Sequence, residues 1–145
     1  MYITTERLIA TFSRQILIQL SNDDSRATEI ALPVIEMAIR FAEERIDAAL
    51  RSRYPLPLQH TPTLIELHAF ALARYWLYAR RPEMKMPETV KEVYQLAIKE
   101  LEQIATGKLH LGVADAGDNQ QQGELLADSG EFKVRSSSKL NTDGY

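Results

Sequence analysis

The sequence predicts a mainly α-helical protein, a compact bundle of about four helices followed by an extended C-terminal tail. Over three long segments, apolar residues recur at intervals of three and four, which is the pattern of an amphipathic helix. Proline, threonine or glycine stands where these segments begin or end. From residue 114 onward the chain is rich in Gly, Gln, Asp and Asn and poor in residues that form a core. We therefore divide it into a helical domain, residues 1–112, and a C-terminal extension, residues 113–145.

The first predicted helix is short. Thr4 or Thr5 can cap its start. Its apolar residues are Leu8, Ile9 and Phe12. We interpret the apolar run from Ile16 to Leu20 as a short connector, because the polar run 21–25 then breaks the pattern.

The second predicted helix runs from about Pro33 to Arg51, with charged residues on the faces that the apolar ones leave. Pro33 is tolerated if it lies in the first turn, and an additional turn from Ala27 onward is the alternative start. The apolar positions are Ile35, Ile39, Ala42, Ile46 and Ala49 or Leu50.

Residues 51–58, Arg-Ser-Arg-Tyr-Pro-Leu-Pro-Leu, cannot continue that helix. Each of the two prolines fixes its own φ and pushes the residue before it toward extended geometry. The segment is therefore predicted to be a stiff arm that ends one helix and directs the chain toward the next. Its candidate structural and interaction residues are Arg53, Tyr54, Pro55 and Pro57.

The third predicted helix opens at Thr61 and Pro62 and extends to about Arg81. It has almost no polar face, so we expect it to be central in the fold or covered by a partner. The fourth predicted helix begins at Pro87 and ends near Gly107, which is a plausible C-terminal cap.

Arg74 stands on the apolar third helix, where an unpaired buried guanidinium would be costly. We expect it to reach solvent or to pair with Asp47, because the connection from Ser52 to Pro62 permits antiparallel packing of the second and third helices. A structural ion pair is favoured over a ligand site. Tyr75 and Tyr78 are further candidate interaction residues beside it.

In the tail, Phe132 and Val134 alternate with polar residues between Glu131 and Ser136, which is typical of a β-strand. Such a short strand is not stable without a neighbouring edge. The tail is therefore compatible with a short β-strand pair or hairpin that forms against another subunit.

Composition narrows the function classes. The net charge of -3 argues against a general nucleic-acid or membrane-surface binder, since both require a basic field. No apolar stretch approaches the length of a membrane span, which predicts an unsecreted protein without membrane contact. The absence of cysteine excludes disulfides and thiolate chemistry. His60, His68 and His110 lack a second ligand at helical spacing, so we predict no metal site. The serines lack a Gly-x-Ser-x-Gly setting and the glycines form no phosphate loop or dinucleotide motif, so we predict no cofactor and no enzymatic activity.

Arginines near the ends of two predicted helices leave DNA binding open as an alternative function. If they converged on one exposed face, they would form a basic rim suited to DNA. Arginines at helix C-termini also complement the helix dipole and bind carbonyl groups, which explains their positions without DNA. The four residues are Arg51, Arg53, Arg80 and Arg81.

An ordered set of short motifs spans most of the chain. It comprises Met1-Tyr2, Thr4, Leu8, Phe12, Ile18-Gln19-Leu20, Ile46-Asp47, Leu50, Arg53-Tyr54-Pro55-Leu56-Pro57-Leu58, Pro62, Leu64, Ala71, Arg74-Tyr75, Leu77-Tyr78, Tyr94, Leu101, Ile104-Ala105, Gly107-Lys108 and Leu111-Gly112. In this combination the chain resembles the small proteins encoded in the head and tail morphogenesis clusters of Mu-like phages and prophages. The resemblance fades after Gly112.

That family is similar to the head-to-tail connector, or head-completion, proteins of tailed phages, which are small helical subunits that form a ring beneath the portal after DNA packaging. The resemblance implies a structural virion protein, a neck adaptor that resides in the host cytoplasm before assembly. Its implied partners are further copies of itself, the portal protein and a tail or tail-completion protein, while channel DNA passes without specific binding. A tail-side completion or terminator component and a DNA-binding packaging-associated factor are the alternatives.

Overall fold

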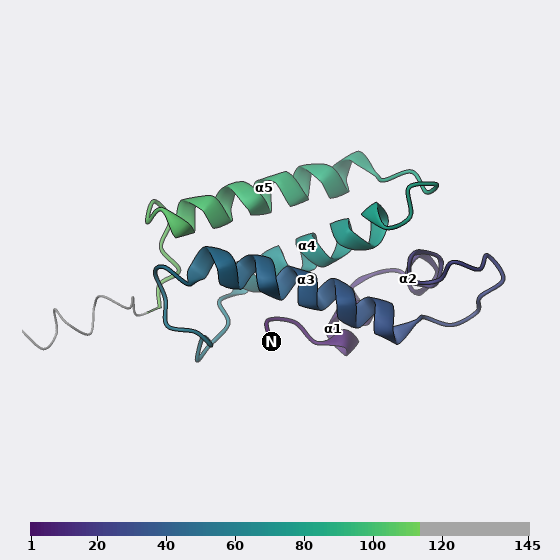
Figure 1. Ribbon diagram of the computed structural model, residues 1–145, viewed down its shortest axis with the longest axis horizontal. Helices are drawn as coiled ribbons and strands as arrows, with labels where there is room; N and C mark the ends of the chain where they lie inside the picture. The colour runs from purple at the N-terminus through teal and green to yellow at the C-terminus, as the bar shows by residue number, and fades with distance from the viewer. Residues whose placement is uncertain (114–145) are drawn as a thin grey trace, which may run out of the picture.

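In the computed structural model, the described part of the chain is residues 1–113 (Figure 1). It contains the α-helices α1 (Thr5–Thr11), α2 (Arg14–Ser21), α3 (Leu32–Leu50), α4 (Thr63–Ala79) and α5 (Glu88–Ala105). Within this part there is no strand, so the prediction of a mainly α fold is confirmed. The predicted strand pair around Phe132 and Val134 lies outside the described residues.

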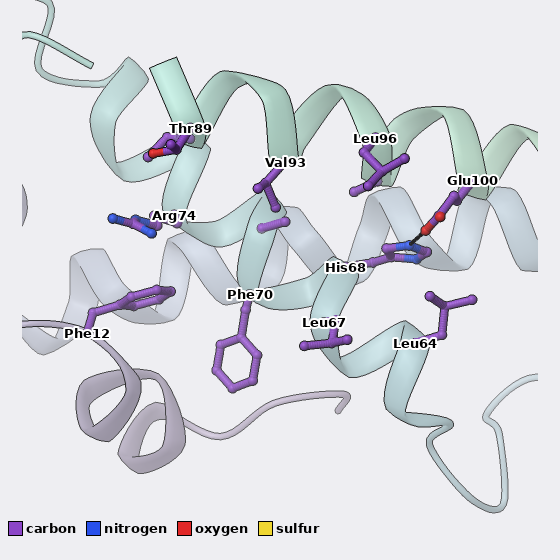
Figure 2. Close-up of a pocket in the computed structure, with 13 residues that line it drawn as sticks. Phe12, Leu64, Leu67, His68, Phe70, Arg74, Thr89, Val93, Leu96 and Glu100 are labelled. Atoms are coloured by element: carbon purple, nitrogen blue, oxygen red, sulfur yellow. Dashed lines mark hydrogen bonds and ion pairs between the residues drawn. The ribbon is translucent and has the colours of Figure 1, made fainter. Parts of the chain in front are cut away.

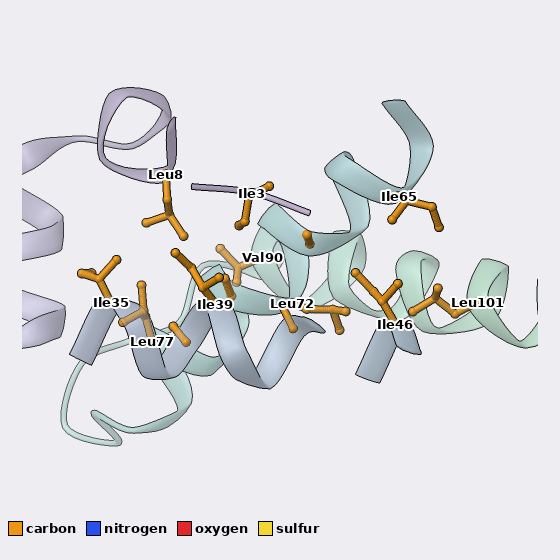
Figure 3. Packing of buried hydrophobic residues seen from close by; sticks show 14 of the residues in the cluster. Ile3, Leu8, Ile35, Ile39, Ile46, Ile65, Leu72, Leu77, Val90 and Leu101 are labelled. Atoms are coloured by element: carbon orange, nitrogen blue, oxygen red, sulfur yellow. The ribbon is translucent and has the colours of Figure 1, made fainter. Parts of the chain in front are cut away.

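The three long helices α3, α4 and α5 run side by side and form the body of the molecule (Figure 1). The two short helices pack near the N-terminal part of α3, and α2 also contacts α4. Figure 3 shows the core that these helices enclose. Its fully buried residues include Leu8, Ile35, Ile46, Ile65, Leu72, Leu77 and Ile104.

The predicted bounds of α1, α3, α4 and α5 lie close to those in the structure, although the predicted cap at Thr61 is wrong, because Pro62 is the N-cap of α4 and no side chain caps this helix. The Oγ1 of Thr4 accepts a hydrogen bond from the backbone N–H of Arg7 at 3.2 Å and so caps α1. Pro62 and Pro87 directly precede α4 and α5. At the other end of α5, Gly107 adopts a φ of 77°, the left-handed conformation that glycine favours.

The segment Arg14–Ser21 is helix α2 rather than the predicted connector. A helix of eight residues is not stable by itself, and tertiary contacts hold this one. Leu17 and Leu20 are buried in the core. Ser21 Oγ also accepts a hydrogen bond from the backbone N–H of Ala31 at 3.0 Å, which closes the loop between α2 and α3.

The arm after α3 packs against the segment that follows α5. Tyr54 is only 2% exposed, and its hydroxyl oxygen accepts a hydrogen bond from the backbone N–H of Leu111 at 3.1 Å. The peptide bond between Leu56 and Pro57 is cis. The arm thus connects α3 to α4 and also supports the end of α5.

The predicted ion pair between Arg74 and Asp47 does not form within residues 1–113. Asp47 instead accepts a hydrogen bond from the hydroxyl of Tyr2. In the antiparallel pair, the end of α3 that carries Asp47 lies beside the start of α4. Arg74 stands eleven residues after the first residue of α4, which is about 16 Å along the helix. The connection permits antiparallel packing, but that packing separates the two side chains.

Candidate functional site

An apolar groove of about 460 Å³ lies between α4 and α5 (Figure 2). Leu67 of α4 and Val93 and Leu96 of α5 are each more than half exposed, at 58%, 52% and 54%. Clustered exposed apolar side chains are typical of surfaces that bind a partner. The residues that line the groove are Phe12, Leu64, Leu67, His68, Phe70, Ala71, Arg74, Thr89, Val90, Val93, Leu96, Ala97 and Glu100, and none comes from α3.

Helical spacing explains why the groove is apolar on both walls. On α5, Val93, Leu96 and Glu100 recur at intervals of three and four and so lie on one face. Leu64 and Leu67 recur in the same way on α4. The two faces meet where the helices pack, and no described segment covers the groove between them.

A polar pair joins the two walls of the groove. His68 Nε2 lies 2.6 Å from Glu100 Oε2, and the dashed line in Figure 2 marks this contact. The histidine side chain is 5% exposed, whereas that of Glu100 is 28% exposed. A carboxylate accepts hydrogen bonds, so Nε2 carries the proton and donates. Within residues 1–113, His68 Nδ1 has no hydrogen-bond partner. The pair connects α4 to α5.

The opposite end of the groove carries a positive charge. The guanidinium of Arg74 lies 5.1 Å from the centroid of the Phe12 ring, a cation–π contact. Phe12 in turn packs edge-to-face against Phe70, with ring centroids 6.1 Å apart. Among residues 1–113 no carboxylate pairs with Arg74. This end can therefore bind an anionic group.

The three predicted interaction tyrosines make contacts inside the subunit. Tyr54 and Tyr78 belong to the hydrophobic core. Tyr75 stacks on Tyr94 of α5, with ring centroids 3.7 Å apart. The three side chains therefore hold the subunit together.

A second, smaller hollow surrounds Tyr2 and brings two predicted residues, Asp47 and Pro57, together. The backbone N–H of Tyr2 donates to Glu43 Oε1 at 3.1 Å, and its hydroxyl donates to Asp47. Burial, followed by the hydrogen bond to Asp47 and the two nearby carboxylates, raises the pKa of the Tyr2 hydroxyl well above its ordinary value. The hydroxyl therefore stays protonated. These contacts fasten the N-terminal residues to α3.

The arginines considered for DNA binding do not converge. At the end of α4, Arg80 donates to the backbone oxygen of Leu20 at 2.5 Å and Arg81 to that of Gln19 at 3.2 Å. Both arginines thus bind carbonyls at the end of α2. Arg51 and Arg53 follow the end of α3, at the other end of the body, and Arg53 lies beside Gly107. Pro55 is exposed on the arm.

The groove residues Leu67, Val93 and Leu96 were not among the predicted site residues. The sequence partly indicated the groove, because the third predicted helix has too few polar residues to face solvent without a partner. Leu96 was a further indication, since it is apolar but does not belong to the row of buried residues on α5. Exposure itself depends on which face α3 covers, and that is a tertiary property.

No metal site is evident in residues 1–113, where no three His, Asp or Glu residues gather around one point. None of the helices in the same part has the combination of length and apolarity that a bilayer span requires.

Comparison with known proteins finds matches over nearly the whole chain. The family model described as "Bacteriophage Mu, Gp36" matches residues 2–127. The chain is 28% identical over 142 residues to "Mu-like prophage FluMu protein gp36" of Haemophilus influenzae, with 96% of each chain covered. It is also 28% identical over 125 residues to "Gene product J" of Escherichia phage Mu, with 86% of each chain covered. The family match extends beyond the last helix.

Proposed function

Since the chain belongs to the bacteriophage Mu Gp36 family, we propose that it is a structural, non-catalytic virion protein. In this proposal it is a head-to-tail connector, or neck adaptor, whose copies form a ring beneath the portal. Membership of this family makes it a Mu-like phage or prophage protein. The connector role goes beyond family membership, and the distribution of exposed apolar residues supports it.

The observation that carries the proposal is that the subunit exposes large apolar side chains on two separate surfaces. One is the groove between α4 and α5. The other is on α3, where Met37 is 55% exposed and does not line the groove. Leu32, which is 49% exposed, stands five residues before it and so lies on a different side of this helix. A ring with head-to-tail contacts needs two different patches on each subunit, because each copy presents one patch to the neighbour before it and the other to the neighbour after it.

The proposed partners are other copies of this chain, the portal protein and a tail or tail-completion protein. The protein would reside in the host cytoplasm before assembly and in the virion neck afterwards. Its net charge of -3 is compatible with a channel through which DNA passes without being held, because neutralising phosphates requires a basic surface.

Two alternatives predict different results. A tail-side completion or terminator component would share the small size and the ring habit, and its position in the particle would distinguish it. A DNA-binding packaging factor would require the arginines to form one basic face. Arg80 and Arg81 instead bind backbone carbonyls of α2, which makes this second alternative the weaker one.

The proposal is tested by light scattering of the purified full-length protein, alone and mixed with its portal, over a range of protein and salt concentrations. We expect a ring-sized species that forms with the portal. Met37→Asp should abolish it, because the substitution places a charge on the apolar surface of α3. Gln95→Asp, an exposed position on α5 outside both apolar surfaces, is the matched control and should leave the ring intact.

A protein that stays monomeric with the portal and shifts duplex DNA in a salt-dependent manner would overturn the proposal in favour of the packaging factor. Labelling of purified particles at the tail side of the neck would overturn it in favour of the tail component.

A further inference from the structure

We propose that the groove between α4 and α5 binds the segment Leu125–Asp128 of the same chain, Leu-Leu-Ala-Asp. This inference goes beyond the proposed function, because it concerns the isolated subunit: the segment occupies the groove before assembly and is displaced when a neighbouring copy binds there in the ring. Four observations support it: the apolar lining of the groove, the place where the described chain ends, the charge of Arg74 and the extent of the family match.

The apolar side chains that line the groove favour the binding of another apolar segment. Leu67, Val93 and Leu96 expose more than half of their surface, and burying apolar surface stabilises by about 25 cal/mol per Å². A groove of about 460 Å³ has room for more than one apolar side chain. The adjacent Leu125 and Leu126 form such a pair, and they are the first two large apolar residues after Val113.

The end of the described chain brings this segment within reach of the groove. Residues 106–113 follow the end of α5, and Leu111 is fastened to Tyr54 of the arm. Leu96 stands nine residues before Ala105, about 14 Å along α5. The twelve residues from 113 to 125 have a root-mean-square length of about 20 Å if they behave as a flexible chain. A linker whose length is close to the distance it must span gives the highest effective concentration.

The charge and spacing of the segment match the groove. In an extended chain, Asp128 lies about 10 Å beyond Leu125. On α4, Arg74 lies seven residues, also about 10 Å, beyond Leu67. With Leu125 against Leu67, the Asp128 carboxylate therefore reaches the guanidinium of Arg74. That guanidinium has no carboxylate partner within residues 1–113.

The family match supplies an independent argument. It extends to residue 127, fourteen residues past the described part of the chain, and so includes both leucines. The match therefore covers positions of the tail that lie beyond the last helix. The docked segment would leave the α3 surface open to a neighbour.

The absence of cysteine from the full chain permits a direct test by disulfide trapping. The full-length double variant Leu96→Cys/Leu126→Cys is oxidised mildly, and disulfide closure within one chain is followed by mass spectrometry and free-thiol titration. The matched control is Gln95→Cys/Leu126→Cys, because residue 95 is exposed, adjacent in sequence and not part of the groove. We expect the groove pair to close about ten-fold faster or more, since docking raises its effective concentration.

The role of Arg74 is tested in the same assay. Arg74→Glu should slow closure of the groove pair, and Asp128→Arg added to that variant should restore it. Equal closure rates for the groove pair and the control pair would overturn the proposal. A disulfide that forms as readily between separate copies carrying only Leu96→Cys and only Leu126→Cys would also overturn it, because the segment would then occupy the groove of a second copy. Neither result depends on the portal, so failure here leaves the connector proposal to its own test.

Discussion

Single residues fasten the outer segments of this molecule to its long helices through partners that are distant in the sequence. Tyr2 is the clearest case, because its backbone N–H binds Glu43 and its hydroxyl binds Asp47. One side chain thereby fastens the N-terminal residues to the second half of α3. The half-buried phenol is surrounded by carboxylates, so its ionisation would place a negative charge beside two others.

Replacing Tyr2 with Phe should lower the free energy of unfolding at neutral pH by about 1–2 kcal/mol, because a hydrogen bond to a carboxylate is lost. The pKa of Tyr2 is raised in the folded state, so the stabilisation is complete below the ordinary tyrosine pKa of about 10 and is lost as the pH rises above it. Tyr2→Phe should therefore also flatten the alkaline decline in stability. Urea unfolding between neutral pH and about pH 11 measures both effects.

Tyr94→Phe is the control for this prediction. Its ring keeps the stacking on Tyr75, and no hydrogen bond of its hydroxyl occurs within residues 1–113. It should retain the alkaline slope of the unaltered protein. If Tyr2→Phe showed the same slope as this control, the assigned role of the Tyr2 hydroxyl would be wrong.

At the scale of elements, the end of α5 and the arm after α3 stabilise one another. Gly107 has positive φ, and the backbone N–H groups of Gly107 and Lys108 donate to the oxygens of Ile104 and Gln103. This is the Schellman arrangement that ends many helices. The guanidinium of Arg53 occupies the space that a side chain at position 107 would need. Gly107 is therefore required for its conformation and for the close approach of the arm.

Gly107→Ala should reduce the free energy of unfolding by about 2 kcal/mol, since an L-residue is strained at positive φ and Arg53 must move. Gly112→Ala is the matched control, because Gly112 also has positive φ but has open space where the new methyl group would lie. Gly112→Ala should lower the free energy of unfolding by less than Gly107→Ala. Combining Gly107→Ala with Arg53→Ala in a double-mutant cycle isolates the contribution of the close approach, and a coupling of zero would contradict the role given to Arg53.

For the molecule as a whole, one hydrophobic core joins the helices of residues 1–113. Its buried members run from Ile3 to Ile104 and come from all five described helices and the arm. The segment just after α5 completes this unit, since Leu111 binds Tyr54. Folding of the body should therefore depend on the chain as far as Val113.

A chain that ends after Val113 should keep its helical circular dichroism and melt within about 5 °C of the full-length protein, because it keeps every core residue of the described part. A chain that ends after Ala105 is the contrasting variant, since it loses the Gly107 cap and the contact between Leu111 and Tyr54. It should melt at a clearly lower temperature. Loss of helical signal in the longer truncation would show that the body needs residues beyond 113.

The sequence by itself determined the helical character of this protein and the approximate bounds of α1, α3, α4 and α5. Apolar periodicity and the residues at helix ends act over three or four neighbours, so they can be read along the chain. The cap at Gly107 was predicted for this reason. The family resemblance was likewise predicted from ordered motifs, and the match to residues 2–127 confirms it.

Only the tertiary structure decided which side chains meet and which apolar residues remain exposed. Helix α2 forms because Leu17 and Leu20 find the core, and Asp47 binds Tyr2 because antiparallel packing carries it away from Arg74. The groove exists because no described segment covers the α4–α5 face that α3 leaves open. These contacts join residues in different segments of the chain, 45 positions apart in the case of Tyr2 and Asp47, and their geometry depends on how whole helices pack. Local periodicity carries no information about that packing.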